Sequence, residues 1–220
     1  MEKYGTIPPR FTKAWWGYIW EYYKWYFISG GVALILIIIT CVQCARNVDY
    51  DMTITYIGEA FFPDEQVAAF EQDVAGRIDD ATGNGQMDVF FQVLTQQDME
   101  QATDAQFAYA MQVKATMEYQ AGESFLFLYS KDQMDYVNNS DSSEGLFMPV
   151  SGWNPGDPNQ GCFVNLQGNR FFAELGFNTD DLYMAVRNIR ASEEDDEKTV
   201  RRYENAVKLA KFVLEGQVNQ

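Results

Sequence analysis

The hydrophobic pattern divides the chain into one long uncharged stretch and a region of short, alternating apolar runs. From Trp25 to Ala45, 21 consecutive residues carry no charge, and they include the aliphatic run Val32 to Ile39. At about 1.5 Å of rise per residue such a helix is about 31 Å long, which matches a hydrocarbon core of about 30 Å. We therefore predict one transmembrane helix over residues 27–45, in a single-pass protein.

The segment before this run is dominated by aromatic rings. Between them, polar residues recur at helical spacing from Lys13 to Lys24 and form a narrow stripe. Indole and phenol rings favour the headgroup layer because each combines an apolar body with a polar edge. We expect an interfacial helix within residues 1–26, and the alternative is a docking face for a partner membrane helix. The membrane-interface residues of this prediction are Trp15, Trp16, Tyr18, Trp20, Tyr22, Tyr23, Lys24, Trp25 and Tyr26.

Residues 46–220 show alternating strand and helix patterns. Runs rich in β-branched and aromatic residues predict strands at 52–58, 87–94, 125–129 and 182–189. Apolar residues spaced by three and four, together with composition, predict helices at 61–78, 97–120 and 131–137. Because helices alternate with strands, we predict a three-layer α/β domain with a mostly parallel sheet.

The last predicted helix starts at Ser192. Ser192 with Asp195 three residues later is typical of a capping box, and the acids from Glu193 to Glu197 place negative charge at the positive end of the helix dipole. Apolar residues then repeat at helical spacing as far as Leu214. We interpret these acids as the start of a helix packed on the sheet rather than as a cation-binding tail.

Charge is distributed unevenly about the apolar run. Basic residues exceed acids before it, whereas residues 47–220 carry 11 basic and 30 acidic side chains, a net of −19. Because cytoplasmic flanks retain Lys and Arg, we predict a cytoplasmic N-terminus and an extracytoplasmic C-terminal domain at the cell membrane. An uncleaved signal anchor is favoured over a cleaved signal peptide, because about 26 residues precede the apolar run. The negative charge argues against nucleic acid as a partner.

Two of the three cysteines, Cys41 and Cys44, fall at the outer end of the predicted span. A redox pair would need a βαβ context, and lipidation of Cys41 would need a smaller residue where Thr40 stands. We expect both cysteines to be simply tolerated at the membrane edge. No disulfide scaffold is indicated, because Cys162 is distant in sequence.

One turn partly matches a calcium-binding loop. Asp80, Thr82 and Asn84 place oxygen atoms at alternate positions before Gly85. The position that requires a bidentate glutamate is occupied by Phe91, inside a predicted strand. We therefore expect a helix-to-strand turn and no cofactor, with Ca²⁺ binding as the alternative.

A long polar connection, residues 138–160, holds the candidate ligand-binding residues. In an open α/β sheet, ligands bind at the carboxyl ends of strands. A loop there carrying Trp153, Asn154 and Asp157 is suited to stack on and hydrogen-bond a sugar or another small solute. The alternative is an ordinary Gly/Pro turn with Trp153 packed against the domain.

The chain lacks the residues of the common catalytic motifs. It has no histidine, no Gly-x-Ser-x-Gly sequence and no phosphate-binding loop, which excludes His-dependent triads and His-liganded zinc. We therefore expect no catalytic residue and no enzyme. Carboxylate chemistry on envelope glycan is the enzymatic alternative, and it would require two acids about 5 to 10 Å apart in a cleft.

Three segments resemble a known set of proteins. Tyr22–Tyr26 before the span, Asp49–Ile54 after it and the Gly-Asn-Gly turn within 79–85 are similar to uncharacterised single-pass envelope proteins of Gram-positive, Clostridia-type bacteria. The resemblance covers mainly the first 95 residues, and it implies an outer domain like one lobe of an extracytoplasmic solute-binding protein. It implies no activity.

These observations predict a membrane-anchored extracytoplasmic binding domain. Its expected partners are the lipid bilayer and either a membrane protein, such as a transporter permease, or a small solute. The domain would then be an accessory subunit of an envelope or transporter complex, or a tethered solute-binding lobe. A structural subunit of an envelope assembly is a further alternative.

Overall fold

The fold was analysed in a computed structural model that describes residues 9–46, 48–95, 117–119, 124–139, 145–155 and 159–218. The chain forms two compact units, residues 1–48 and 49–220, and each is treated by itself.

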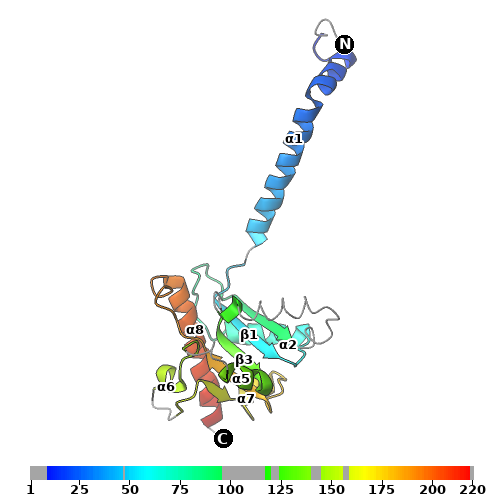
Figure 1. The fold of residues 1–220 in the computed structure, drawn as a ribbon. Coiled ribbons are helices and arrows are strands. Elements are labelled where there is room, and N and C mark those ends of the chain that lie inside the picture. Colours follow the sequence, from blue (N-terminus) through cyan, green and yellow to red (C-terminus); the bar gives the residue numbers. More distant parts are fainter. Residues whose placement is uncertain are drawn as a thin grey trace. The chain divides into compact units, whose positions relative to one another are not determined.

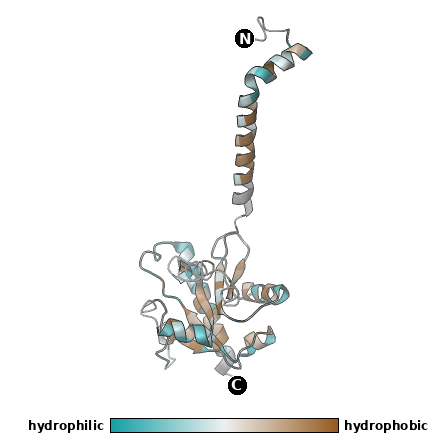
Figure 2. Ribbon diagram, turned by 45° about the vertical axis from the view of Figure 1, so that its right-hand side comes forward, coloured by the Kyte–Doolittle hydropathy of each residue, from teal (hydrophilic) through white to brown (hydrophobic). Residues whose placement is uncertain are grey.

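The first unit is one continuous helix, α1 (Lys13–Arg46). Thr12 caps it, because the Thr12 hydroxyl accepts a hydrogen bond from the backbone N–H of Trp15 at 3.3 Å. The segment Lys13–Thr40 is long and apolar enough to cross a membrane, and none of it is buried. The helix is therefore a candidate membrane span or signal sequence. Figure 2 shows that its apolar run lies beyond the mixed aromatic and polar N-terminal part, whereas the sequence predicted two consecutive helices.

The second unit is a mixed α/β domain built on a five-stranded sheet (Figure 1). The strand order is β2-β1-β3-β5-β4. Strand β1 pairs in parallel with both β2 and β3, and β5 pairs antiparallel with β3 and β4. The strands are β1 (Met52–Gly58), β2 (Val89–Thr95), β3 (Ser124–Ser130), β4 (Phe163–Asn165) and β5 (Leu182–Val186).

Five helices of this unit are described. They are α2 (Asp64–Ala75), α5 (Lys131–Asn138), α6 (Val150–Trp153), α7 (Arg170–Glu174) and α8 (Glu197–Val218). Successive residues of a strand face opposite sides of the sheet, and the core divides accordingly. Met52, Ile54 and Tyr56, which alternate along β1, pack in one cluster with residues of α2, α7 and α8. Ile57 faces the other side and packs in a second cluster with Val137 of α5.

The structure confirms an α/β domain with a mostly parallel sheet core. The first three predicted strands are found within two residues of their predicted bounds, and β5 begins at Leu182 as predicted but ends at Val186. The three-layer arrangement stays a prediction, since most of the helix predicted at 97–120 lies outside the described residues; only 117–119 are described, and they are helical. Strand β4 was not predicted.

The predicted start of the last helix was wrong. Residues 191–195 form turns, and α8 begins at Glu197. Asp196 precedes it, and its carboxylate accepts a hydrogen bond from the Thr199 hydroxyl at 2.5 Å. Glu193 lies in the preceding turns, where its carboxylate binds the buried Arg187.

Candidate functional site

A cavity of about 350 Å³ lies where the parallel strands β1 and β3 end. Ile57 pairs with Tyr129 at these ends, and Ser130 pairs with Leu182 at the start of β5. After β1 the chain continues through α2 to β2, which lies on one side of the β1–β3 pair. After β3 it continues through α5 to β4 and β5, which lie on the other side of that pair. Ligands bind at such switch points in α/β sheets. The cavity is lined by Tyr56, Glu59, Ala60, Phe62, Ser130, Lys131, Asp132, Asn178, Asp181 and Leu182.

The aromatic side of the cavity is held by a close approach at Gly58. A Cβ atom there would lie 2.7 Å from Cζ of Tyr56 and 2.8 Å from Cβ of Ser130, so only glycine fits. The Tyr56 ring is buried, and its hydroxyl accepts a hydrogen bond from the backbone N–H of Ala60 at 3.1 Å. The ring of Phe62 packs edge to face against this ring, with 4.8 Å between the two ring centroids. Burial raises the pKa of Tyr56, so the phenol stays neutral at physiological pH.

The polar side of the cavity carries more negative than positive groups. Glu59, Asp132 and Asp181 contribute carboxylates, and Lys131 contributes one ammonium. Within the described part of the chain, none of these carboxylates forms an ion pair. The Ser130 hydroxyl is buried from solvent and has no hydrogen-bond partner there either. Buried hydroxyls without a partner are rare because each costs free energy; among the described residues the Tyr129 hydroxyl and the Trp153 indole nitrogen are buried in the same way.

Two of the three predicted ligand-binding residues, Trp153 and Asn154, do not line this cavity. Trp153 ends α6 and is only 3 % exposed, in the core cluster that also holds Ile54. Its ring is therefore not available for stacking on a solute, as in the alternative of a packed tryptophan. Asn154 follows as the C-cap of α6, and Asp157 lies outside the described residues.

The turn with the partial calcium match uses its oxygens internally. The Asp80 carboxylate accepts hydrogen bonds from the backbone N–H groups of Gly83 at 2.6 Å and Gly85 at 2.8 Å, and these hold its pKa below the usual value. The side-chain oxygen of Asn84 accepts from the backbone N–H of Gln86 at 2.7 Å. Among the described residues no group of three acids or cysteines is placed to hold a metal. Calcium binding at Asp80, Thr82 and Asn84 stays untested.

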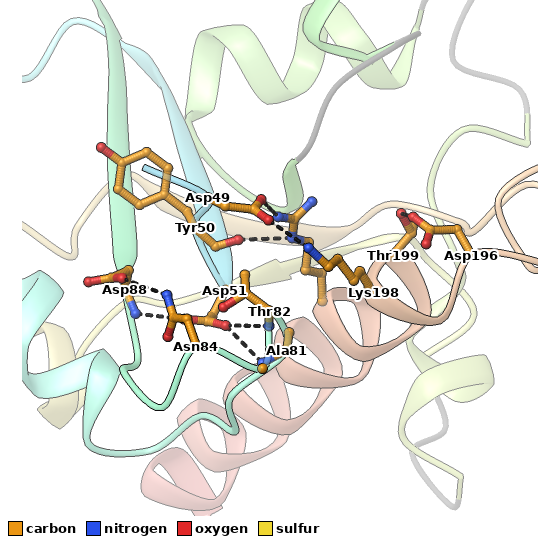
Figure 3. A network of polar contacts seen from close by, with 12 residues as sticks. Asp49, Tyr50, Asp51, Ala81, Thr82, Asn84, Asp88, Asp196, Lys198 and Thr199 are labelled. Atoms are coloured by element: carbon orange, nitrogen blue, oxygen red, sulfur yellow. Dashed lines mark hydrogen bonds and ion pairs between the residues drawn. The ribbon is translucent and has the colours of Figure 1, made fainter. Parts of the chain in front are cut away.

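The same turn is fastened to the sheet by Asp51, which sequence reasoning missed. Asp51 is fully buried just before β1, and its carboxylate accepts backbone N–H bonds from Ala81 and Thr82 at 2.8 Å each and from Asp88 at 2.7 Å (Figure 3). The signal for this role is an acid directly before an apolar strand. Asp51 therefore sets the path of the loop between α2 and β2.

A second buried charge was also missed. Arg187 follows β5 and is 1 % exposed, with its guanidinium 4.3 Å from the ring centroid of Phe125. Its Nη1 donates to the Glu193 carboxylate at 3.1 Å, and its Nε donates to the Ser124 carbonyl at 3.1 Å. Burial lowers the pKa of Arg187. This pair joins the end of β5 to the turn before α8.

The predicted membrane-interface residues lie on α1. Most of their rings are well exposed: Trp25 and Tyr26 are 71 % and 74 % exposed, and Trp16 and Trp20 are 59 % and 62 % exposed. The side chains of Cys41 and Cys44 lie outside the described part. Cys162 is a free, half-buried cysteine, and burial raises the pKa of its thiol.

Comparison with known proteins gives no guide to the site. No protein-family model matches the chain, no curated protein is similar to it, and no solved structure resembles it at a significant level.

Proposed function

We propose that this protein is a membrane-anchored extracytoplasmic domain that binds a small solute in the cavity at the carboxyl ends of β1 and β3. The cavity is the observation that carries the proposal. Its volume of about 350 Å³ lies within the usual range for small-molecule sites. It combines apolar lining residues, among them the half-buried Phe62, with several polar groups, and such groups fix the orientation of a ligand.

The anchor in this proposal is α1. Its candidate span carries no acid or base between Trp25 and Ala45, and basic residues exceed acids before it, which favours a cytoplasmic N-terminus. An anchored domain keeps its solute site near the membrane surface. The resemblance to tethered, solute-binding-like envelope proteins is consistent with this role.

A solute screen on the full chain tests the proposal. Thermal unfolding is measured in detergent with panels of sugars, amino acids, carboxylates and amines, because a ligand of the native state raises the unfolding temperature. The Ala60→Trp variant fills the cavity while retaining the backbone N–H that binds Tyr56. The exposed Ala68→Trp substitution on α2 is the control. The proposal requires a solute that stabilises the wild type and Ala68→Trp but not Ala60→Trp; if no solute does so, the proposal fails.

An accessory subunit of a membrane complex is the second candidate, and the exposed rings of α1 favour it. A purification of the full chain after crosslinking in its native membrane identifies what binds. A stoichiometric membrane protein that is lost when Trp16, Trp20 and Tyr23 are replaced by Leu would support this role. The same preparation tests a glycan hydrolase, the enzymatic alternative, by its activity on envelope glycan.

A further inference from the structure

The first residues of the α/β domain are fastened to helix α8. The Asp49 carboxylate forms ion pairs with Lys198, at 2.9 Å, and with Arg202 (Figure 3). Arg202 also donates a hydrogen bond from its Nε to the Tyr50 carbonyl at 2.9 Å. The chain is therefore part of the folded domain from Asp49 onward, and two residues of the sequence separate this point from the end of α1 at Arg46.

This short connection limits the distance between the domain and the membrane. The step rests on the proposed function, in which α1 spans the bilayer. Three residues reach at most about 11 Å, so Asp49 lies no farther than that from Arg46. Arg46 follows the uncharged stretch and therefore marks the outer boundary of the hydrocarbon core. Because the headgroup layer beyond that boundary is about 5 to 7 Å thick, the segment before β1 lies in this layer or next to it.

A small apolar patch lies at the same end of the sheet. It consists of Tyr50, Met87 and Phe90, and we call it the Tyr50 patch. The rings of Tyr50 and Phe90 stack with 5.0 Å between their centroids, and Phe90 is 38 % exposed although it lies in β2. Met87 is 45 % exposed. The backbone N–H of Asp51 donates to the Asp88 carbonyl at 2.8 Å, so the preceding residues, Tyr50 and Met87, stand on neighbouring segments.

The composition of the Tyr50 patch fits lipid headgroups. Tyrosine and phenylalanine rings favour the boundary between headgroups and acyl chains, where their apolar bodies leave water. The patch carries no charge, whereas residues 47–220 carry a net charge of −19, which opposes contact with an anionic surface. The surface that the patch fits is therefore a zwitterionic one.

We infer that the Tyr50 patch rests in the headgroup layer of the membrane that α1 spans and contacts zwitterionic lipid there. The ion pairs of Asp49 keep the patch rigidly joined to the domain, so this contact fixes the direction of the sheet. The amino ends of β1 and β2 face the bilayer. The cavity at the carboxyl end of β1 then lies up to about 23 Å farther out, because β1 has seven residues. It opens where solutes arrive from the surrounding water.

Photocrosslinking of the full chain in phosphatidylcholine vesicles tests this inference. Benzoylphenylalanine replaces Phe90 in one variant and Met87 in a second, which keeps the test valid if the first substitution disturbs the stacked rings. The control places the same probe at Phe61, which is 78 % exposed and follows the carboxyl end of β1. After irradiation, intact-mass spectrometry measures the fraction of chain that carries a phosphatidylcholine adduct.

The adduct at position 90 or 87 is expected to exceed that at position 61 by at least about fivefold, because the probe at position 61 lies beyond the headgroup layer. The greater exposure of Phe61 acts in the opposite direction, so exposure alone cannot give this result. Equal lipid adducts at the three positions, or crosslinks from positions 90 and 87 to protein instead of lipid, overturn the inference.

Extraction of the vesicles with alkaline carbonate separates the inference from the proposed function. If the chain is released by carbonate, α1 is not an anchor, and the inference fails together with the membrane-anchored role. If the chain stays in the vesicles and lipid adducts at positions 90 and 87 do not exceed the control, the inference alone fails and the proposed function stands.

Discussion

Arg187 is buried at the end of β5, and Glu193 is the carboxylate that binds it. Breaking a buried ion pair by removing one partner is costly because the remaining charge stays desolvated. We therefore expect Glu193→Gln to lower the free energy of unfolding by about 3 kcal/mol. Urea unfolding of the full chain in detergent, followed by circular dichroism, measures this. Exposed Glu194→Gln is the control, and an equal effect of the two substitutions would contradict the role of Glu193.

The same pair makes stability depend on pH. Burial opposes ionisation of Glu193, but hydrogen bonds from Arg190 and Arg187 outweigh it and hold the pKa of Glu193 below its ordinary value of 4.5. A carboxyl with a depressed folded pKa stabilises the fold above its unfolded pKa, and this contribution is lost as pH falls through the folded pKa. Stability should therefore fall more steeply below pH 4.5 in the wild type than in Glu193→Gln. An equal loss of stability with falling pH in the two proteins would disprove the role of the Glu193 carboxylate in this pH dependence.

Asp51 is expected to be a major determinant of stability. Its carboxylate accepts three backbone N–H bonds in a fully buried position, and Asp51→Ala leaves these donors without partners. Each unsatisfied donor costs about 1 to 3 kcal/mol, so the loss should be at least about 3 kcal/mol. Asp51→Asn keeps one acceptor oxygen and should lose less. Urea unfolding checks the order, with exposed Asp64→Asn as the unaffected control; the account is wrong if alanine and asparagine are equally tolerated.

Gly58 has no room for a side chain, since a Cβ would lie 2.8 Å from Cβ of Ser130. Gly58→Ala should cost about 1 to 3 kcal/mol through overpacking, and it should shift the Tyr56 ring at the cavity. Gly76, at the end of α2, has a φ of −71°, and a Cβ there would lie 3.5 Å from the nearest atom, so Gly76→Ala should be tolerated. Thermal unfolding of the Gly58→Ala and Gly76→Ala variants gives the two midpoints, and equal midpoints would contradict the close packing at Gly58.

Local patterns predicted the elements of the fold better than the site. The run Met52–Gly58 is recognisable because β-branched and aromatic residues ending at glycine favour a strand. Strand β4 has only three residues and was missed because it exists through pairing with β5. Helix α8 starts later than Ser192: Glu193 lies in the preceding turns and binds Arg187, a contact that local capping rules do not consider, and Asp196 stands before the helix instead.

The candidate site could not be read from the sequence because it depends on strand order. Glu59, Ser130 and Asp181 are far apart along the chain and meet only because β1 lies beside β3 and β3 beside β5. Trp153 was predicted to bind a ligand because it is aromatic and lies in a Gly/Pro-rich loop, but its ring is buried in the core. Asp51 was visible as an acid before an apolar strand, but its three N–H donors come from the connection between α2 and β2, 30 to 37 residues away.

The most direct test of the central claim is to identify what the cavity retains. The full chain is purified from its own membrane in mild detergent, and the solutes released on denaturation are identified by mass spectrometry. The measurement is repeated with Ala60→Trp and with the control Ala68→Trp. We predict a stoichiometric small solute in the wild type and in Ala68→Trp that is absent from Ala60→Trp. The same solutes in all three preparations, or none in any, would contradict a solute site at the carboxyl ends of β1 and β3.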